Sequence, residues 1–282
     1  MVLRQWVAVL GAALLVGSAP EAQTSSKITF SRVVTEPNLG RLEFVHAVAD
    51  LNGDGRDDIL AGGYGDYYDG ATPEERLTRT SLHVFISGED GSLRHAPELV
   101  DGTIEVRNGV VVADDFNGDA KPDLAVFDGG VYVASHSSGY GNPPQLFLSS
   151  EDGLLRPSDA LAEAVRREHE LRPNSRYSGP ADLHLKSATA GDIDGDGDVD
   201  LWVDSIGGAN ISSHFMVNNG DGTFTIDEKR APTALRYHPP ESWYHLEGHL
   251  VDLDNDGDLD LALAQNRGLD PSTFNQSSIV LI

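Results

Sequence analysis

The sequence predicts an all-β protein, a β-propeller of four-stranded antiparallel blades with four repeat units present. Three observations predict it. One acidic ten-residue pattern recurs four times in the 282 residues. Short apolar runs flank every copy, and in three units a glycine-centred turn follows between two further apolar runs. Repetition of one supersecondary unit at a nearly fixed period is the signature of propellers and related repeat folds.

The acidic pattern places Asp or Asn at positions 1, 3, 5 and 9, with an aliphatic residue at position 10. Its copies are DLNGDGRDDI from Asp50, DFNGDAKPDL from Asp115, DIDGDGDVDL from Asp192 and DLDNDGDLDL from Asp252, so successive copies start 60 to 77 residues apart. We expect each unit to run strand A, acidic loop, strand B, long loop, strand C, tight turn, strand D. The predicted blades span about 41–95, 106–157, 185–229 and 245–282.

One segment departs from the β pattern. After Ser158, the run DALAEAVRREHEL places Leu161 and Val165 on one helical face. Ser158 is a favourable N-cap residue. We therefore expect a short helix inserted between strand D of the second unit and strand A of the third.

The N-terminus predicts where the protein is located, and the net charge limits the kinds of partner it can bind. Arg4 precedes the apolar run Trp6–Val16, which is too short to span a membrane and resembles a signal sequence. We expect 1–22 to be a signal peptide and the protein to be secreted, periplasmic or on the cell surface, with no membrane span. The formal net charge of −25 excludes nucleic-acid binders. The absence of cysteine excludes disulfides and thiolate metal sites.

Oxygen ligands at alternating positions of a tight turn suit a hard cation such as Ca²⁺. An EF-hand would need a glutamate at position 12, where this chain has Ala61, Val126, Val203 and Leu263. Asp and Gly are also common in polar turns that bind no metal. However, the same ligand positions recur in all four copies, and this favours metal binding. Position 7 would contribute its backbone carbonyl. The predicted ligands are Asp50, Asn52, Asp54, Arg56, Asp58, Asp115, Asn117, Asp119, Lys121, Asp123, Asp192, Asp194, Asp196, Asp198, Asp200, Asp252, Asp254, Asp256, Asp258 and Asp260.

The four loops differ in the acidity of their ligand sets. The third and fourth have Asp at positions 1, 3, 5 and 9, whereas the first two have Asn52 and Asn117 at position 3. The second also has Ala120 where the others have the turn glycine. We therefore predict that affinity decreases from the third and fourth loops to the first and then the second.

The repeated D-x-[DN]-x-D-G-x-x-D-[LI] pattern between strands resembles the FG-GAP/VCBS repeats, the blade units of integrin alpha-chain N-terminal propellers. The resemblance covers about 27–282 and implies Ca²⁺ in each acidic loop. The second copy departs from it at Ala120 and Pro122. Such propellers usually have seven blades, which implies that this chain is an incomplete propeller. The alternative is a closed ring of four blades, with 28–34 completing the last one.

Long loops with aromatic residues are expected at the end of the blades opposite the acidic loops. Rigid scaffolds commonly carry function on such loops. The sequence predicts a non-catalytic binding or adhesion module for a glycan or an extracellular protein. The alternative is a polysaccharide lyase or another carbohydrate-active enzyme, with Lys186, His245 or His249 as base. The predicted ligand-contacting residues are Tyr64, Tyr67, Tyr68, Tyr140, Trp243, Tyr244 and His245.

Overall fold

The computed structural model describes most of the repeat region. All described residues belong to one structural unit, Val34–Ile282. The predicted signal peptide and the strand predicted at 28–34 lie outside them. Within the described part, no helix has the length and apolar character needed to cross a membrane. The described residues are 39, 42–63, 79–107, 109–129, 131–132, 139–140, 142–171, 185–205, 213–227, 229–230, 244–267 and 279–280.

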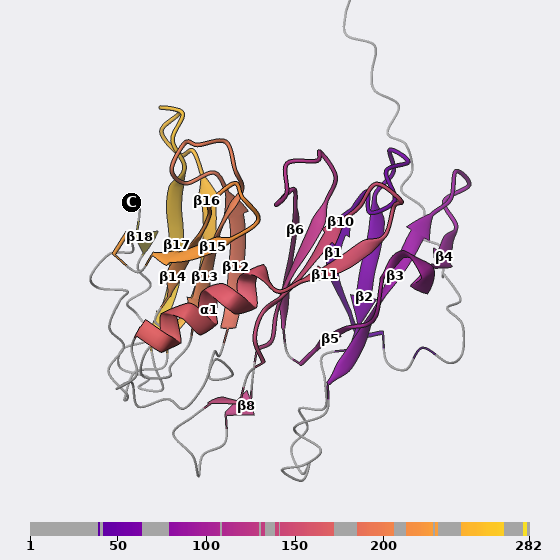
Figure 1. Ribbon diagram of the computed structural model, residues 1–282, viewed down its shortest axis with the longest axis horizontal. Helices are drawn as coiled ribbons and strands as arrows, with labels where there is room; N and C mark the ends of the chain where they lie inside the picture. The colour runs from indigo at the N-terminus through magenta and orange to yellow at the C-terminus, as the bar shows by residue number, and fades with distance from the viewer. Residues whose placement is uncertain are drawn as a thin grey trace, which may run out of the picture. The chain divides into compact units, whose positions relative to one another are not determined.

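Four antiparallel sheets follow one another along the chain (Figure 1). In the second and third, the strands lie side by side in their sequence order. Sheet one contains β1 (Phe44–Ala49), β2 (Asp58–Gly62), β3 (Thr80–Ser87), β4 (Leu93–His95) and β5 (Ile104–Val106). Sheet two contains β6 (Val110–Asp114), β7 (Asp123–Phe127), β10 (Gln145–Ser149) and β11 (Leu155–Ser158), and sheet three contains β12 (Leu185–Gly191), β13 (Asp200–Ser205), β14 (His214–Asn218) and β15 (Phe224–Asp227). Sheet four contains β16 (Tyr244–Val251), β17 (Asp260–Arg267) and β18 (Ile279–Val280), and a separate hairpin pairs β8 (Val131–Tyr132) with β9 (Gly139–Tyr140).

The central strand β7 is covered on both faces. Its sequence is DLAVF, and every residue is buried. Leu124 and Val126 pack in an apolar cluster with residues of sheet one, whereas Ala125 and Phe127 pack in a cluster with residues of sheet three. Successive side chains of a strand point to opposite faces. The first three sheets therefore pack face to face.

Sheets three and four pack in the same way. Trp202 of β13 is fully buried in a cluster with Leu261 and Leu263 of β17. Gly248 of β16 permits this approach, because a Cβ there would lie 2.7 Å from two atoms of the Trp202 indole. The first strands are also neighbours, since β6 contacts β1 and β12, and β12 contacts β16. The chain is thus nearly all-β, with antiparallel sheets arranged as propeller-like blades.

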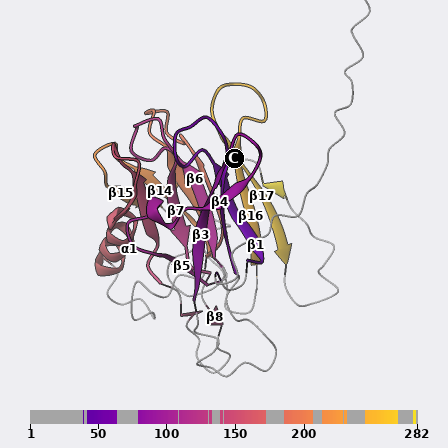
Figure 2. The same ribbon diagram turned by 90° about the vertical axis from the view of Figure 1, so that its right-hand side faces the viewer.

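The predicted helix is confirmed as α1 (Ala160–Leu171). It begins directly after Asp159, one residue later than expected, although Ser158 Oγ still accepts the N–H of Ala160 at 3.4 Å. Leu161 and Val165 are fully buried in the cluster between sheets two and three. The helix lies beside β15 and also contacts β10 (Figure 2). It therefore packs across two neighbouring sheets.

The outer edge of sheet one differs from the expected single strand D. Both β4 and β5 pair with β3, at its two ends. Between them, Pro97 opens a short 3₁₀ helix, Pro97–Leu99. Proline lacks the N–H that a continuing strand would donate. The strand is therefore split in two.

Candidate metal centres in the A–B loops

Each acidic segment connects the first two strands of its sheet, and we call it an A–B loop. Loops one to four are residues 50–58, 115–123, 192–200 and 252–260, numbered as positions 1 to 9 within each loop. All four have left-handed backbone at positions 4 and 6, with φ between +61° and +101°. Glycine adopts this conformation without strain, and it fills six of the eight positions. The eight residues are Gly53, Gly55, Gly118, Ala120, Gly195, Gly197, Asn255 and Gly257.

The carboxylate at position 1 shapes the turn by accepting backbone hydrogen bonds. In loop one, Asp50 Oδ1 accepts the N–H of Asp54 at 2.9 Å, and Oδ2 accepts that of Gly55 at 2.7 Å. Position 5 accepts the N–H of position 7 in every loop. The bond from position 6 to position 1 recurs at Asp115, Asp192 and Asp252. Several aspartates of the motif therefore have a structural role in addition to any ligand role.

The carboxylate at position 9 ties its loop to the third strand of the sheet. Asp200 is fully buried. Its Oδ2 accepts the N–H of Ile193 at 2.9 Å, and its Oδ1 accepts that of Asn218 in β14 at 2.7 Å. Asp58 and Asp123 make the same two kinds of bond. Burial raises the pKa of Asp123 and Asp200 to about 6 despite these hydrogen bonds, and it also raises the pKa of Asp58.

Three carboxylates converge in loop three and again in loop four. In each group, one ligand oxygen from position 1, position 3 and position 9 lies within 4.8 Å of the others. In loop four, the buried Oδ1 of Asp252 has no hydrogen-bond partner within the described part of the chain. Such a set of hard oxygen donors fits Ca²⁺. The groups are Asp192, Asp194 and Asp200, and Asp252, Asp254 and Asp260.

The structure brings together only part of each predicted ligand set. Position 5, which is Asp196 in loop three and Asp256 in loop four, is not in these groups. In loops one and two, position 3 is Asn52 or Asn117, whose side-chain oxygen accepts the N–H of position 5 at 2.8 or 2.9 Å. These loops therefore lack the third carboxylate, and the predicted order of affinities stays a prediction.

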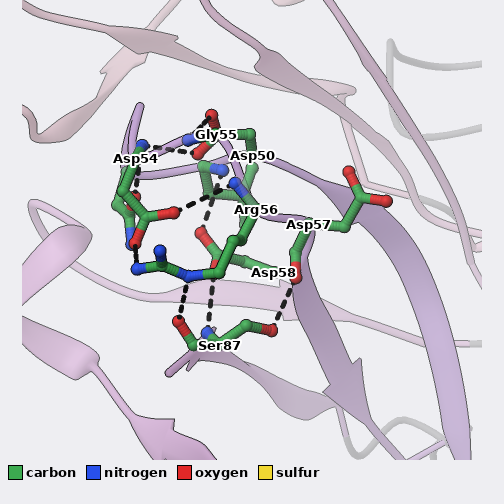
Figure 3. A network of polar contacts seen from close by, with 9 residues as sticks. Asp50, Asp54, Gly55, Arg56, Asp57, Asp58 and Ser87 are labelled. Atoms are coloured by element: carbon green, nitrogen blue, oxygen red, sulfur yellow. Dashed lines mark hydrogen bonds and ion pairs between the residues drawn. The ribbon is translucent and has the colours of Figure 1, made fainter. Parts of the chain in front are cut away.

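The side chain at position 7 of loop one forms contacts that the sequence did not predict. Figure 3 shows Arg56 between its own loop and the end of β3. Its Nη2 lies 2.5 Å from Asp54 Oδ2, and its Nε donates to the carbonyl oxygen of Ser87 at 3.1 Å. Ser87 Oγ in turn donates to the carbonyl of Asp57 at 2.6 Å. The side chain at position 7 thus helps to hold the loop closed, and the predicted ligand role of its backbone carbonyl stays a prediction.

The predicted ligand-contacting residues are only partly described. Tyr64, Tyr67, Tyr68 and Trp243 lie outside the described residues. Tyr140 lies in β9, and Tyr244 and His245 lie in β16, each described by its backbone alone. The β8–β9 hairpin follows the end of β7 opposite loop two. Tyr140 is therefore on the side of the blade where the sequence placed a ligand surface, which stays a prediction.

Sequence reasoning missed two buried acids at the far ends of the second strands. Asp128, which follows β7, is 1% exposed, and one of its oxygens lies 3.7 Å from Arg107 Nη2 and 3.8 Å from Arg79 Nε. Asp204 of β13 is fully buried and accepts a hydrogen bond from Ser213 Oγ. The available signal was an aspartate directly after an apolar run, in LAVFD and LWVD. The partners of Asp128 come from distant segments, which a local pattern does not show, whereas Ser213 lies nine residues after Asp204.

One comparison with known proteins, that with protein families, agrees with the repeat pattern. The FG-GAP-like repeat family matches residues 50–126, which contain loops one and two. A search of curated proteins found no match. A solved structure of a lectin from Agrocybe aegerita, described as recognising non-reducing terminal N-acetylglucosamine, is similar at 16% sequence identity and a TM-score of 0.40. The similarity covers 83% of this chain but 50% of the lectin, so this chain spans about half its length. Residues 50–126 thus match an FG-GAP-like repeat, which agrees with the resemblance predicted from the sequence.

Proposed function

We propose that this chain is an exported, calcium-binding propeller module in which loops three and four hold Ca²⁺. The observation that carries the proposal is the convergence of carboxylates from positions 1, 3 and 9 in both loops. Asp252 Oδ1 adds support, because a buried acceptor without a partner among the described residues is costly unless a cation satisfies it. Ca²⁺ accepts six to eight oxygens in flexible geometry, whereas Mg²⁺ demands a tight octahedron.

The local charge gives a second physical reason. Each of these loops has five aspartates within nine residues and no basic residue. Crowded like charges destabilise the folded state unless a cation neutralises them. A ligand that binds the native state alone stabilises it by about 2.7 kcal/mol at a hundred times its dissociation constant. Two occupied loops would therefore raise stability by several kcal/mol.

Calorimetric titration and thermal unfolding of the calcium-stripped chain test the proposal. We expect Ca²⁺ to bind and to raise the melting temperature strongly, and Mg²⁺ to do so weakly. Asp252→Asn should remove one bound Ca²⁺, whereas Glu151→Gln, which removes an exposed charge from a turn of sheet two, should remove none. An unchanged melting temperature after verified removal of metal would contradict structural calcium binding.

We further propose that sheet one is covered by another propeller blade in the complete assembly. Its first strand has two large apolar side chains that are more than half exposed and lie opposite neighbouring residues of the same face of β2, Val45 (59%) and Val48 (58%). A covering blade would come from a larger propeller, which we favour, or from closure of a four-bladed ring. Small-angle X-ray scattering of the chain distinguishes a closed ring from an open row of blades by its radius of gyration.

The end of the blades opposite the A–B loops is proposed to bind a glycan or an extracellular protein without catalysis. The support is the aromatic composition of the long loops there, including Tyr64, Tyr67 and Tyr68. A glycan array with wild type and a variant carrying alanine at these three positions tests it. A second experiment incubates the protein with uronic-acid polysaccharides. If an unsaturated product forms, and if His245→Ala abolishes its formation, the protein is a lyase instead.

A further inference from the structure

On the basis of the Ca²⁺ binding proposed above, we propose that Arg56 and Lys121 supply inside loops one and two the positive charge that Ca²⁺ supplies elsewhere. Only loops three and four then take up a divalent cation. The residue at position 7 decides whether an A–B loop depends on metal. Three features of the loops support this: the contacts of Arg56 and Lys121, the hydrogen bonds of the other polar side chains, and the net charge of each loop.

The Arg56 guanidinium joins the position 5 carboxylate of loop one to the end of β3, to which Asp58 is also bonded. It pairs with Asp54 Oδ2 at 2.5 Å and donates from Nε to the carbonyl of Ser87 at 3.1 Å (Figure 3). The backbone N–H of Arg56 donates to the other oxygen of Asp54 at 3.0 Å. One residue therefore engages both oxygens of the position 5 carboxylate and links the loop to the end of β3.

The other polar side chains of loop one lie around the contact between Arg56 and Asp54. Asn52 Nδ2 donates to Asp54 Oδ2 at 3.1 Å, so position 3 presents an N–H group where loops three and four present a carboxylate. Both oxygens of Asp50 accept backbone N–H groups, as do those of Asp192 in loop three, so position 1 does not distinguish the loops. A divalent cation entering loop one would meet a guanidinium and an amide N–H within the same turn, and like charges at this distance repel strongly.

Loop two has a lysine at position 7, which reaches the corresponding turn but, among the described residues, forms no ion pair with Asp119. Lys121 Nζ donates to the carbonyl of Ser150 at 3.2 Å, at the turn after β10 that corresponds to the turn after β3. Asn117 Nδ2 donates to the carbonyl of Ser149 at 3.3 Å. Ser149 Oγ donates to the carboxylate of Asp119. The first two loops are thus closed against the turn between their third and fourth strands by groups of the chain itself.

Loops three and four have the opposite charge at the same position, Asp198 and Asp258. In loop three the side chain also faces the turn after the third strand, because a Cβ on Gly220 would lie 2.3 Å from Asp198 Oδ2. The nine residues carry formal charges of −3 and −2 in loops one and two but −5 in each of loops three and four. The two loops without a cation at position 7 are also the two in which three carboxylates converge, because they have Asp instead of Asn at position 3.

Arg230 does not close loop three in the same manner. It approaches from the turn after β15, with Nη2 at 3.7 Å from Asp194 Oδ2 and 3.6 Å between its Nε and Asp227 Oδ2, and its Nη1 donates to the carbonyl of Ile193 at 3.0 Å. The Arg230 and Arg56 side chains are equally exposed, at 38%, so exposure does not distinguish them. The difference is that Arg56 is part of its loop and lies 2.5 Å from the position 5 carboxylate, whereas Arg230 comes from outside loop three and lies 3.7 Å from Asp194.

Counting bound Ca²⁺ by equilibrium dialysis of the full calcium-stripped chain tests the proposal. We expect two ions for wild type, one for Asp252→Asn, and still two for Asp50→Asn. The double variant Asn52→Asp/Arg56→Asp, which gives loop one the acids of loop three at these positions, should bind three. Circular dichroism verifies that each variant is folded. If the double variant does not fold, the comparison between Asp50→Asn and Asp252→Asn decides.

The outcomes separate this proposal from the function on which it rests. Four ions per wild-type chain, or a count that falls in Asp50→Asn, would overturn the role of Arg56 and leave calcium binding intact. No ions at all would overturn both. A folded double variant that still binds two would overturn the charge argument. As an independent readout, Arg56→Gln should lower the melting temperature of the metal-free chain, and Arg56→Lys should lower it less.

Discussion

Lowering the pH from about 7.5 to about 5 should stabilise the metal-free protein through two buried carboxyl groups. Burial raises the pKa of Asp123 and Asp200 from 3.8 to about 6. Between these values the folded state keeps protons that the unfolded state releases, so the stabilisation is present at low pH and is lost as the pH rises through 6. For each group, the free energy of unfolding changes by about 1.4 kcal/mol over this interval.

Saturating Ca²⁺ should abolish the part of this dependence that comes from Asp200. The cation binds the ionised form of Asp200, so protons compete with it. In the loaded protein Asp200 is then ionised in both the folded and the unfolded state between about pH 5 and 7.5, so it contributes no change across this interval. Asp123 lies in loop two, which is proposed to take no Ca²⁺, and it keeps its contribution.

Urea unfolding at several pH values, with and without Ca²⁺, measures both dependences. Repulsion among the excess acidic residues also weakens at low pH, so the informative comparison is with Asp200→Asn, which lacks the titrating group. Without metal, the change across the interval should be smaller by about 1.4 kcal/mol in this variant. Glu151→Gln, which removes an exposed charge, should behave like wild type. Equal changes in wild type and Asp200→Asn would refute the reasoning.

Three substitutions test the packing and the loop geometry by urea or thermal unfolding. Ala120→Gly should stabilise by about 1 kcal/mol, because Ala120 holds a left-handed φ of +64°; no gain would mean that this turn is unstrained. Gly248→Ala should destabilise by about 1–3 kcal/mol, because its Cβ would overlap Trp202; an unchanged midpoint would contradict the close approach of sheets three and four. Asn218→Ala should cost about 1–3 kcal/mol, because Asn218 Nδ2 donates to the carbonyl of Phe116 at 2.8 Å; a neutral result would show that water replaces this bond.

The strand order and the acidic loops could be predicted because their signals are local. A run such as LAVF between an acidic loop and a polar stretch reads as a strand from its own residues, and β7 lies at Asp123–Phe127. The helix after Ser158 has an apolar face that repeats at helical spacing and needs no distant partner. Patterns of period two or 3.6 thus located the elements to within a few residues.

The contacts between elements could not be predicted in the same way. Arg56 and Ser87 are 31 residues apart, and nothing near Arg56 in sequence shows that its side chain reaches the end of β3. The bonds of Asp200 to Ile193 and Asn218 likewise depend on which strand lies next to it. The left-handed residue at position 4 had a local signal that sequence reasoning overlooked, since three of the four loops have glycine there.

The acidic motif has to form a backbone turn and to balance the charge of its carboxylates, and different positions of the motif serve these two requirements. Positions 1, 5 and 9 accept backbone N–H groups in every loop, so these aspartates form the turn whether or not a cation is present. Positions 3 and 7 change from Asn and a basic residue in loops one and two to Asp in loops three and four. Since the backbone turn is shared, the difference between the loops is one of charge, and under the proposal above loops one and two fold around their own side chains whereas loops three and four take up Ca²⁺.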